Sequence, residues 1–123
     1  MGDYVSQGRV NGYACRSAEA GGAGMLLLPH VTGIEPEMRD EAQMFAYAGF
    51  TTFVWDPYPG FDLEKGGEPP RCVDETCVAD QVACVSYMLS ELGVQRVGMI
   101  GWCMGGRMAL NLAARERRLA AAE

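Results

Sequence analysis

The segment from 96 to 106 reads Arg96-Val97-Gly98-Met99-Ile100-Gly101-Trp102-Cys103-Met104-Gly105-Gly106. Its first half is a short apolar run, typical of a strand that is buried on both faces of a parallel sheet. Apolar side chains then recur at helical spacing as far as Ala113. We expect Arg115, Arg117 and Arg118 to lie in the last turns of this helix, because cations there complement the helix dipole. The segment therefore predicts a buried strand that turns sharply into a helix.

The pattern Gly101-x-Cys103-x-Gly105 is typical of a nucleophile elbow, in which a tight strand-to-helix turn exposes one reactive side chain. The strand and helix backbones nearly touch there, so the residues two before and two after the nucleophile must be small. Cys103 would then lie at a helix N-terminus, where the dipole stabilises negative charge. The Met104 N–H would point toward a developing oxyanion. We expect the second oxyanion donor in the loop 30–33.

Two other interpretations of this turn stay open. In one of them, Cys103 is a buried thiol that only packs in a glycine-rich turn. In the other, the glycines cradle a phosphate in a nucleotide-binding fold. That fold needs an acidic residue roughly 20 residues further on, at the end of the next strand. The chain ends at Glu123, before such a strand could be completed.

The rest of the chain alternates predicted strands and helices. Two short extended pieces lie within residues 1–16, around the turn-prone pair Asn11-Gly12. Further strands are predicted at 25–28, 50–55 and 96–100, helices at 36–49 and 74–93 (with Asp74 as N-cap), and a long loop at 58–71. This order predicts an α/β fold with right-handed crossovers and a mostly parallel sheet.

The composition is that of one ordinary globular domain of 123 residues with a net charge of −6. An acidic chain argues against nucleic-acid binding, and no apolar run approaches the roughly 20 residues that span a bilayer. The N-terminus lacks the features of a signal peptide, so we expect a cytoplasmic protein with reduced thiols and no membrane partner. The spacings of Cys72, Cys77 and Cys84 do not form the ligand pairs of a zinc site. We expect these cysteines to be small buried side chains.

From about Val10 onward the sequence resembles the dienelactone hydrolase family, α/β-hydrolases that use a cysteine nucleophile. The elbow carries most of the resemblance, and four weaker blocks with similar spacing precede it: Leu26–Gly33, Met38-Arg39, Ala48–Phe50 and Val54–Tyr58. The resemblance implies a three-layer αβα domain, α/β-hydrolase-like, with a mostly parallel sheet. Residues 1–123 would be the N-terminal half of that domain, truncated after the elbow helix.

The resemblance also implies hydrolysis of a small-molecule lactone or carboxylic ester through a thioester acyl-enzyme. In this scheme Cys103 attacks the carbonyl carbon, and the N–H groups of Met104 and Val31 hold the oxyanion. Trp102 is a candidate neighbour of the site, and Arg71 is a candidate ligand for a substrate carboxylate. Water then releases the acid, and no metal or organic cofactor is expected.

The sequence departs from the family at the catalytic base. The family's triad continues with an Asp and a His after the elbow, whereas this chain ends at Glu123 and its single histidine, His30, precedes the elbow. Alignment on Gly33 places His30 where the family has a Glu that interacts with the nucleophile. His30 therefore either pairs with Cys103 or only shapes the oxyanion loop.

Two functional hypotheses follow. One is a hydrolase of the dienelactone hydrolase type, and the other is a catalytically incompetent fragment or interaction module without the triad Asp and His. The end of the chain at Glu123 also leads to a structural prediction, because in the family further strands pair on the far side of the elbow strand. We expect Val97–Ile100 to be a bare apolar edge through which the protein self-associates.

Overall fold

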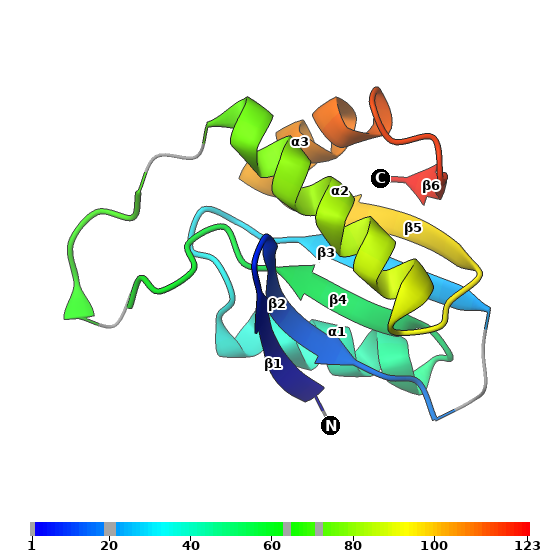
Figure 1. Ribbon diagram of the computed structural model, residues 1–123. Coiled ribbons are helices and arrows are strands. Elements are labelled where there is room, and N and C mark those ends of the chain that lie inside the picture. The colour runs from blue at the N-terminus through cyan, green and yellow to red at the C-terminus, as the bar shows by residue number, and fades with distance from the viewer. Residues whose placement is uncertain (1, 19–21, 63–64, 71–72) are drawn as a thin grey trace.

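The computed structural model describes residues 2–18, 22–62, 65–70 and 73–123. The elements are β1 Gly2–Gln7, β2 Val10–Cys15, β3 Ala23–Leu28, α1 Pro36–Tyr47, β4 Thr51–Trp55, α2 Asp74–Ser90, β5 Arg96–Gly101, α3 Met104–Ala113 and β6 Leu119–Ala122. The six strands form one sheet in the order β1-β2-β4-β3-β5-β6 (Figure 1). The predicted alternation of strands and helices is therefore confirmed.

The sheet is parallel from β4 through β3 and β5 to β6, and antiparallel only where β1 and β2 join it. β3 lies near the middle, paired with β4 on one side and β5 on the other. Leu26, Leu27 and Leu28 are fully buried because both faces of this strand are covered. The central position of β3 explains why its sequence is a continuous apolar run, as expected for a strand that is buried on both faces.

The helices form two layers around the sheet, with α1 on one face and α2 and α3 on the other (Figure 1). The larger hydrophobic core lies under α2 and α3, and the smaller one lies under α1. Together with the sheet these layers give the predicted αβα arrangement. None of the helices within the described ranges is long and apolar enough to cross a membrane.

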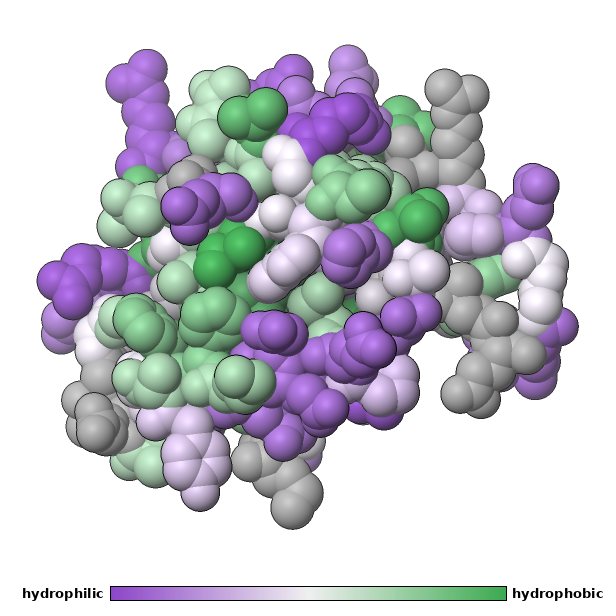
Figure 2. Space-filling model, turned by 180° about the vertical axis from the view of Figure 1, so that it is seen from behind, coloured by the Kyte–Doolittle hydropathy of each residue, from purple (hydrophilic) through white to green (hydrophobic). Residues whose placement is uncertain are grey.

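The α1 face of the sheet is covered less completely than the opposite face. α1 contacts β4 and β2, whereas Met25 on β3 and Ile100 on β5 are only partly buried on this side. Seen from behind, hydrophobic side chains gather over this face (Figure 2). Met44, on the outer side of α1, is 66% exposed.

The elbow strand is not the edge of the sheet, and the prediction of a bare edge at Val97–Ile100 is wrong. After α3 the chain returns as β6, which pairs in parallel with β5 through Val97 and Leu119 and through Met99 and Ala122. The physical reason is that residues 119–122 supply the missing ladder partner, so β6 becomes the edge. The sheet order then leaves β5 paired on both sides.

The prediction that Arg115, Arg117 and Arg118 end the last helix is also wrong, because α3 stops at Ala113. Glu116, which is buried, turns the chain instead. Its carboxylate accepts hydrogen bonds from the backbone N–H and the guanidinium of Arg118. These hydrogen bonds lower the pKa of Glu116 despite its burial. The local ion pair therefore directs the chain into β6 rather than extending the helix.

Three other predicted positions also shift. α2 begins with Asp74 as its first helical residue, after Val73 as N-cap, because the Asp74 carboxylate pairs with Arg107 of α3 instead of capping. The helix ends at Ser90, and Gly93 lies in the following turn with φ +71°. At the N-terminus, the turn between β1 and β2 lies at Gly8, with φ +57°, rather than at the pair Asn11-Gly12.

Candidate active site

Cys103 lies at the sharp turn between β5 and α3, as the elbow pattern predicts. Its backbone has φ +55° and ψ −110°, and no other non-glycine residue in the described ranges has a positive φ. A conformation of this kind is costly for a residue with a side chain and persists only where the surrounding structure imposes it. The turn leaves Cys103 exposed at the N-terminus of α3.

The two elbow glycines explain how the chain can make this turn. A Cβ on Gly101 would overlap the backbone of Gly105 and Gly106, and a Cβ on Gly105 would overlap the carbonyl of Leu28 at the end of β3. The Trp102 N–H also donates to the Leu28 carbonyl, at 3.1 Å. The elbow is therefore packed backbone to backbone against the central strand, and both glycines are required by contact.

The first residues of α3 supply the backbone donors expected at such a site. The N–H groups of Gly105 and Gly106 donate to the carbonyls of Trp102 and Cys103. In contrast, the Met104 N–H makes no hydrogen bond with any described residue. It is one of the unpaired donors that a helix N-terminus presents, and it directly follows the thiol.

The loop after β3 presents a second unpaired donor. The Gly33 N–H donates to the His30 carbonyl at 2.9 Å, which closes a turn with Val31 and Thr32 at its tip. Val31 is 52% exposed, and its N–H has no partner within the described residues. Because β3 and β5 are parallel neighbours, this loop and the elbow both follow the carboxyl ends of their strands and lie at the same end of the sheet.

His30 lies beside Trp102, with 6.5 Å between the two ring centroids. Both side chains line a small cavity of about 110 Å³, together with Thr32, Gly33, Glu35, Glu37, Met38 and Glu41. No hydrogen bond joins the His30 imidazole to Cys103 among the described residues. The structure thus brings His30 and Trp102 together at the carboxyl end of the parallel strands, where the elbow lies.

Asp56 and Tyr58 follow β4 at the same carboxyl end of the parallel strands. One Asp56 carboxylate oxygen accepts the Tyr58 N–H at 2.8 Å, so Asp56 caps the turn. Burial raises the pKa of Asp56, an effect that this hydrogen bond opposes. Both residues line a cavity of about 360 Å³ whose other lining residues are Tyr4, Ile34, Gly60, Phe61 and Asp62.

The other cysteines do not resemble Cys103. Cys15 and Cys84 are free and buried, and burial together with the charge of Asp80 raises the pKa of Cys84 to about 12. Cys77 is buried, as predicted, but it is disulfide-bonded, so the expectation of reduced thiols is wrong for this residue. Arg71 and Cys72 lie outside the described residues.

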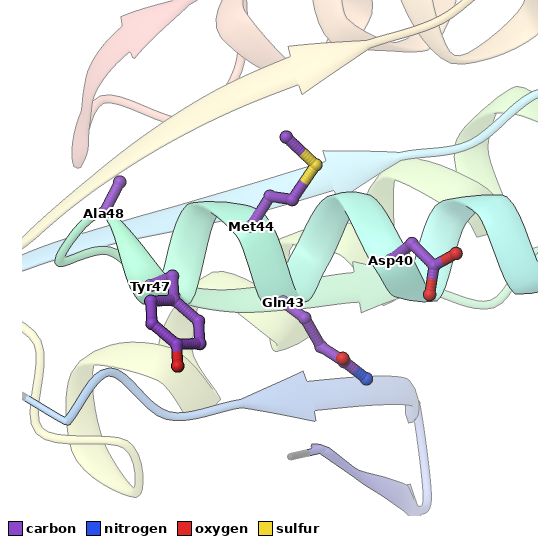
Figure 3. Close-up of a pocket in the computed structure, with 5 residues that line it drawn as sticks. All are labelled: Asp40, Gln43, Met44, Tyr47 and Ala48. Carbon is purple, nitrogen blue, oxygen red and sulfur yellow. The ribbon is translucent and has the colours of Figure 1, made fainter.

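No group of three or more His, Cys, Asp or Glu side chains in the described ranges is arranged to hold a metal ion. A surface depression of about 600 Å³ lies away from the elbow. Its lining side chains come from α1 and the residue after it: Asp40, Gln43, Met44, Tyr47 and Ala48 (Figure 3). None of these described lining residues is a cysteine, serine or histidine.

The parallel sheet, its helical crossovers and the strained cysteine between β5 and α3 define an α/β-hydrolase fold. The sequence profile of the dienelactone hydrolase family matches residues 10–123. The chain belongs to that family.

Two curated proteins are similar to this chain in sequence. An uncharacterized protein of Pseudomonas aeruginosa is 38% identical over 84 residues, which cover 65% of this chain and 22% of the relative. The carboxymethylenebutenolidase homolog of Mus musculus is 26% identical over 119 residues, which cover 86% of this chain and 47% of the relative. The chain thus spans less than half the length of these two curated relatives.

Solved structures share the fold at low sequence identity. A Klebsiella pneumoniae protein that carries the name dienelactone hydrolase superposes with a TM-score of 0.81 at 20% identity, over 98% of this chain and 57% of its own. The α/β-hydrolase GrgF from a Penicillium species gives a TM-score of 0.77 at 19% identity, over 98% of this chain and 44% of its own. The described elements thus correspond to part of the hydrolase domain in each case.

Proposed function

We propose that the chain carries the nucleophile half of an ester or lactone hydrolase, with Cys103 as the nucleophile. The observation that carries this proposal is the strained, exposed backbone of Cys103 at the start of α3. Membership of a hydrolase family supports it. Because the relatives are longer than this chain, the activity of the whole protein is part of the same proposal.

In the proposed reaction the Cys103 thiolate attacks the carbonyl carbon of the ester or lactone. A carbon–sulfur bond forms and the carbonyl electrons move onto oxygen, which the N–H groups of Met104 and Val31 stabilise. The tetrahedral intermediate then expels the alkoxide, which takes a proton, and leaves a thioester on Cys103. Attack of water on the thioester releases the acid and restores the thiol.

His30 is the only histidine that the chain itself could offer as a base. Its ring is tilted against that of Trp102, and it makes no hydrogen bond to Cys103 within the described residues, which favours the role of shaping the oxyanion loop. The pH profile of Cys103 alkylation, compared between the wild type and His30→Ala, tests this. Identical profiles would support the loop role, and a displaced profile would support a Cys–His pair. Arg71 stays a predicted ligand for a substrate carboxylate.

A single-turnover experiment with p-nitrophenyl acetate tests the proposal. We expect a burst of p-nitrophenolate equal to the amount of protein, followed by slow or no turnover. A burst without turnover would mean that the elbow acylates and that deacylation needs groups this chain lacks. The absence of any burst would favour the second hypothesis, a catalytically incompetent fragment or interaction module.

Self-association through the sheet edge also stays a prediction, with β6 as the edge in place of β5. An unpaired strand edge is a template for pairing with another chain. Sedimentation velocity over a range of concentrations measures it. A single monomeric species at all concentrations would contradict the prediction.

A further inference from the structure

Tyr58 lies between the elbow and the cavity of about 360 Å³ at the carboxyl end of the parallel strands. It is only 4% exposed, and its hydroxyl lies 3.9 Å from the sulfur of Met104. Asp56 and Phe61 line this cavity together with Tyr58. The sequence motif around Val54–Tyr58 contributed to the family resemblance, but the reaction described above gives Tyr58 no role.

The backbone of Tyr58 is held rigidly in this place. Its N–H donates to the Asp56 carboxylate at 2.8 Å, and its carbonyl accepts the Phe61 N–H at 3.0 Å. The Phe61 ring contacts the Tyr58 ring edge-on, with 6.4 Å between the centroids. Tyr58 is thus fixed to the end of β4 on one side and reaches α3 on the other.

Met104 is the residue of α3 that the Tyr58 hydroxyl contacts. It is the first residue of α3, its N–H has no described acceptor, and its side chain packs partly buried against the larger core. The Tyr58 hydroxyl is the polar partner of its thioether. Holding the Met104 side chain against Tyr58 limits the movement of the first turn of α3, and the Met104 N–H moves with that turn.

We propose that Tyr58 is a positioning residue that aims the Met104 N–H at the oxyanion by holding the Met104 side chain. This inference rests on the proposed function, because it assumes that Met104 is an oxyanion donor. Hydrogen bonds weaken steeply as the donor angle closes. A misdirected donor therefore loses part of its contribution to acyl transfer, even when the fold is intact.

The test compares two reactions of the same thiol in the full chain. Acylation of Cys103 by p-nitrophenyl acetate passes through an oxyanion, whereas alkylation by iodoacetamide does not. Losing one oxyanion donor entirely costs about 10²–10³ in rate, so we expect Tyr58→Phe to slow acylation by about tenfold. The alkylation rate should be unchanged. The matched control is Tyr47→Phe, which alters an almost fully exposed tyrosine on α1 and should change neither rate.

A second variant separates positioning from general packing. Met104→Leu keeps the backbone N–H and removes the sulfur that Tyr58 contacts. If Tyr58 acts through this sulfur, Tyr58→Phe should have no further effect on acylation in the Met104→Leu background. Such non-additivity is what a double-mutant cycle reports for two groups in contact.

Three results would overturn the inference. These are an unchanged acylation rate in Tyr58→Phe, a parallel loss of acylation and alkylation, and full additivity of the two substitutions. In each case the wild-type protein would still be acylated, and the proposed function would stand. If the wild type itself is alkylated but never acylated, the proposed function fails first and this inference fails with it.

Discussion

Cys84 and Cys103 are both free thiols, yet they lie in regions with opposite properties. Cys84 is fully buried in α2 among the apolar side chains of the larger core, and burial raises its pKa to about 12. Cys103 is exposed and lies where the backbone is forced into a positive φ. The comparison shows that the reactivity expected of a cysteine here is set by backbone geometry and solvent access.

The largest expected effect is the selectivity between these two thiols. At pH 8 a thiol of pKa about 12 is thiolate in roughly one molecule in ten thousand. We therefore expect iodoacetamide to alkylate Cys103 at least about 1,000-fold faster than Cys84 in the folded protein. Peptide mass spectrometry of a time course measures both rates.

Unfolding the protein in urea supplies the control, because both thiols should then react at similar rates. Cys103→Ser should remove the fast phase and leave the slow one. Equal alkylation rates of Cys84 and Cys103 in the folded protein would contradict the comparison.

The next largest effect concerns the glycines of the elbow. Gly101→Ala and Gly105→Ala would each push a Cβ into backbone atoms. We expect either change to lower the free energy of unfolding by about 3 kcal/mol or more and to abolish acylation of Cys103. Urea titration and the p-nitrophenolate burst measure the two outcomes.

Gly106→Ala is the matched control for this prediction. The nearest atom to its added Cβ is the Gly101 carbonyl oxygen at 3.7 Å, an ordinary contact. Alanine inside a helix is favoured over glycine by roughly 0.5–1 kcal/mol, so this variant should be as stable as the wild type or more stable. If all three alanine variants behave alike, close backbone contact does not explain the elbow glycines.

A smaller effect is expected in the core around α2. Gln81 is fully buried, and its amide nitrogen contacts the Met108 sulfur at 3.6 Å, while its amide oxygen has no hydrogen-bond partner among the described residues. We expect Gln81→Leu to raise the free energy of unfolding by about 1 kcal/mol, because it removes an unpaired buried polar group. Urea titration measures this change, and the Cys103 acylation rate should stay constant.

Gln81→Glu is the companion variant and should destabilise the protein, because it buries a carboxyl group. A Gln81→Leu variant less stable than the wild type would show that the amide oxygen is satisfied in solution.

The smallest expected effect is the pH dependence that Asp56 contributes. Burial raises its pKa above the ordinary value of 3.8, so the folded protein binds this proton more tightly than the unfolded chain does. The cost of ionising Asp56 is therefore absent well below pH 3.8 and fully present once the pH exceeds the folded-state pKa. Asp56→Asn keeps an oxygen for the Tyr58 N–H and should raise the urea midpoint at pH 7.

This difference in midpoint should shrink as the pH falls toward 3.8. Asp3→Asn, at an exposed site on β1, controls for the loss of one charge. A midpoint difference that grows as the pH falls would contradict the sign of the prediction.

The sequence was most informative where local pattern and packing agree. Gly101, Cys103 and Gly105 predicted the elbow because its requirements are local, namely small residues at fixed spacing between a strand and a helix. The contact between Tyr58 and Met104 could not be predicted, because residues far apart in the chain meet only once β4 and α3 are in place.

The end of the chain was predicted wrongly for a similar reason. Arginines after an apolar helix resemble a helix C-terminus in sequence. In the structure Glu116 binds Arg118 locally and directs the chain into β6, so a side-chain pair overrides the helical pattern. Pairing with β5 then makes residues 119–122 a strand.

The most direct test of Cys103 as the nucleophile is peptide mass spectrometry of the full chain after one equivalent of p-nitrophenyl acetate. The expected result is one acetyl group, as a thioester on the peptide that contains Cys103, with none on Cys15 or Cys84 and none in Cys103→Ser. Acetylation of other residues at the same rate in the wild type and in Cys103→Ser, with Cys103 unmodified, would contradict it.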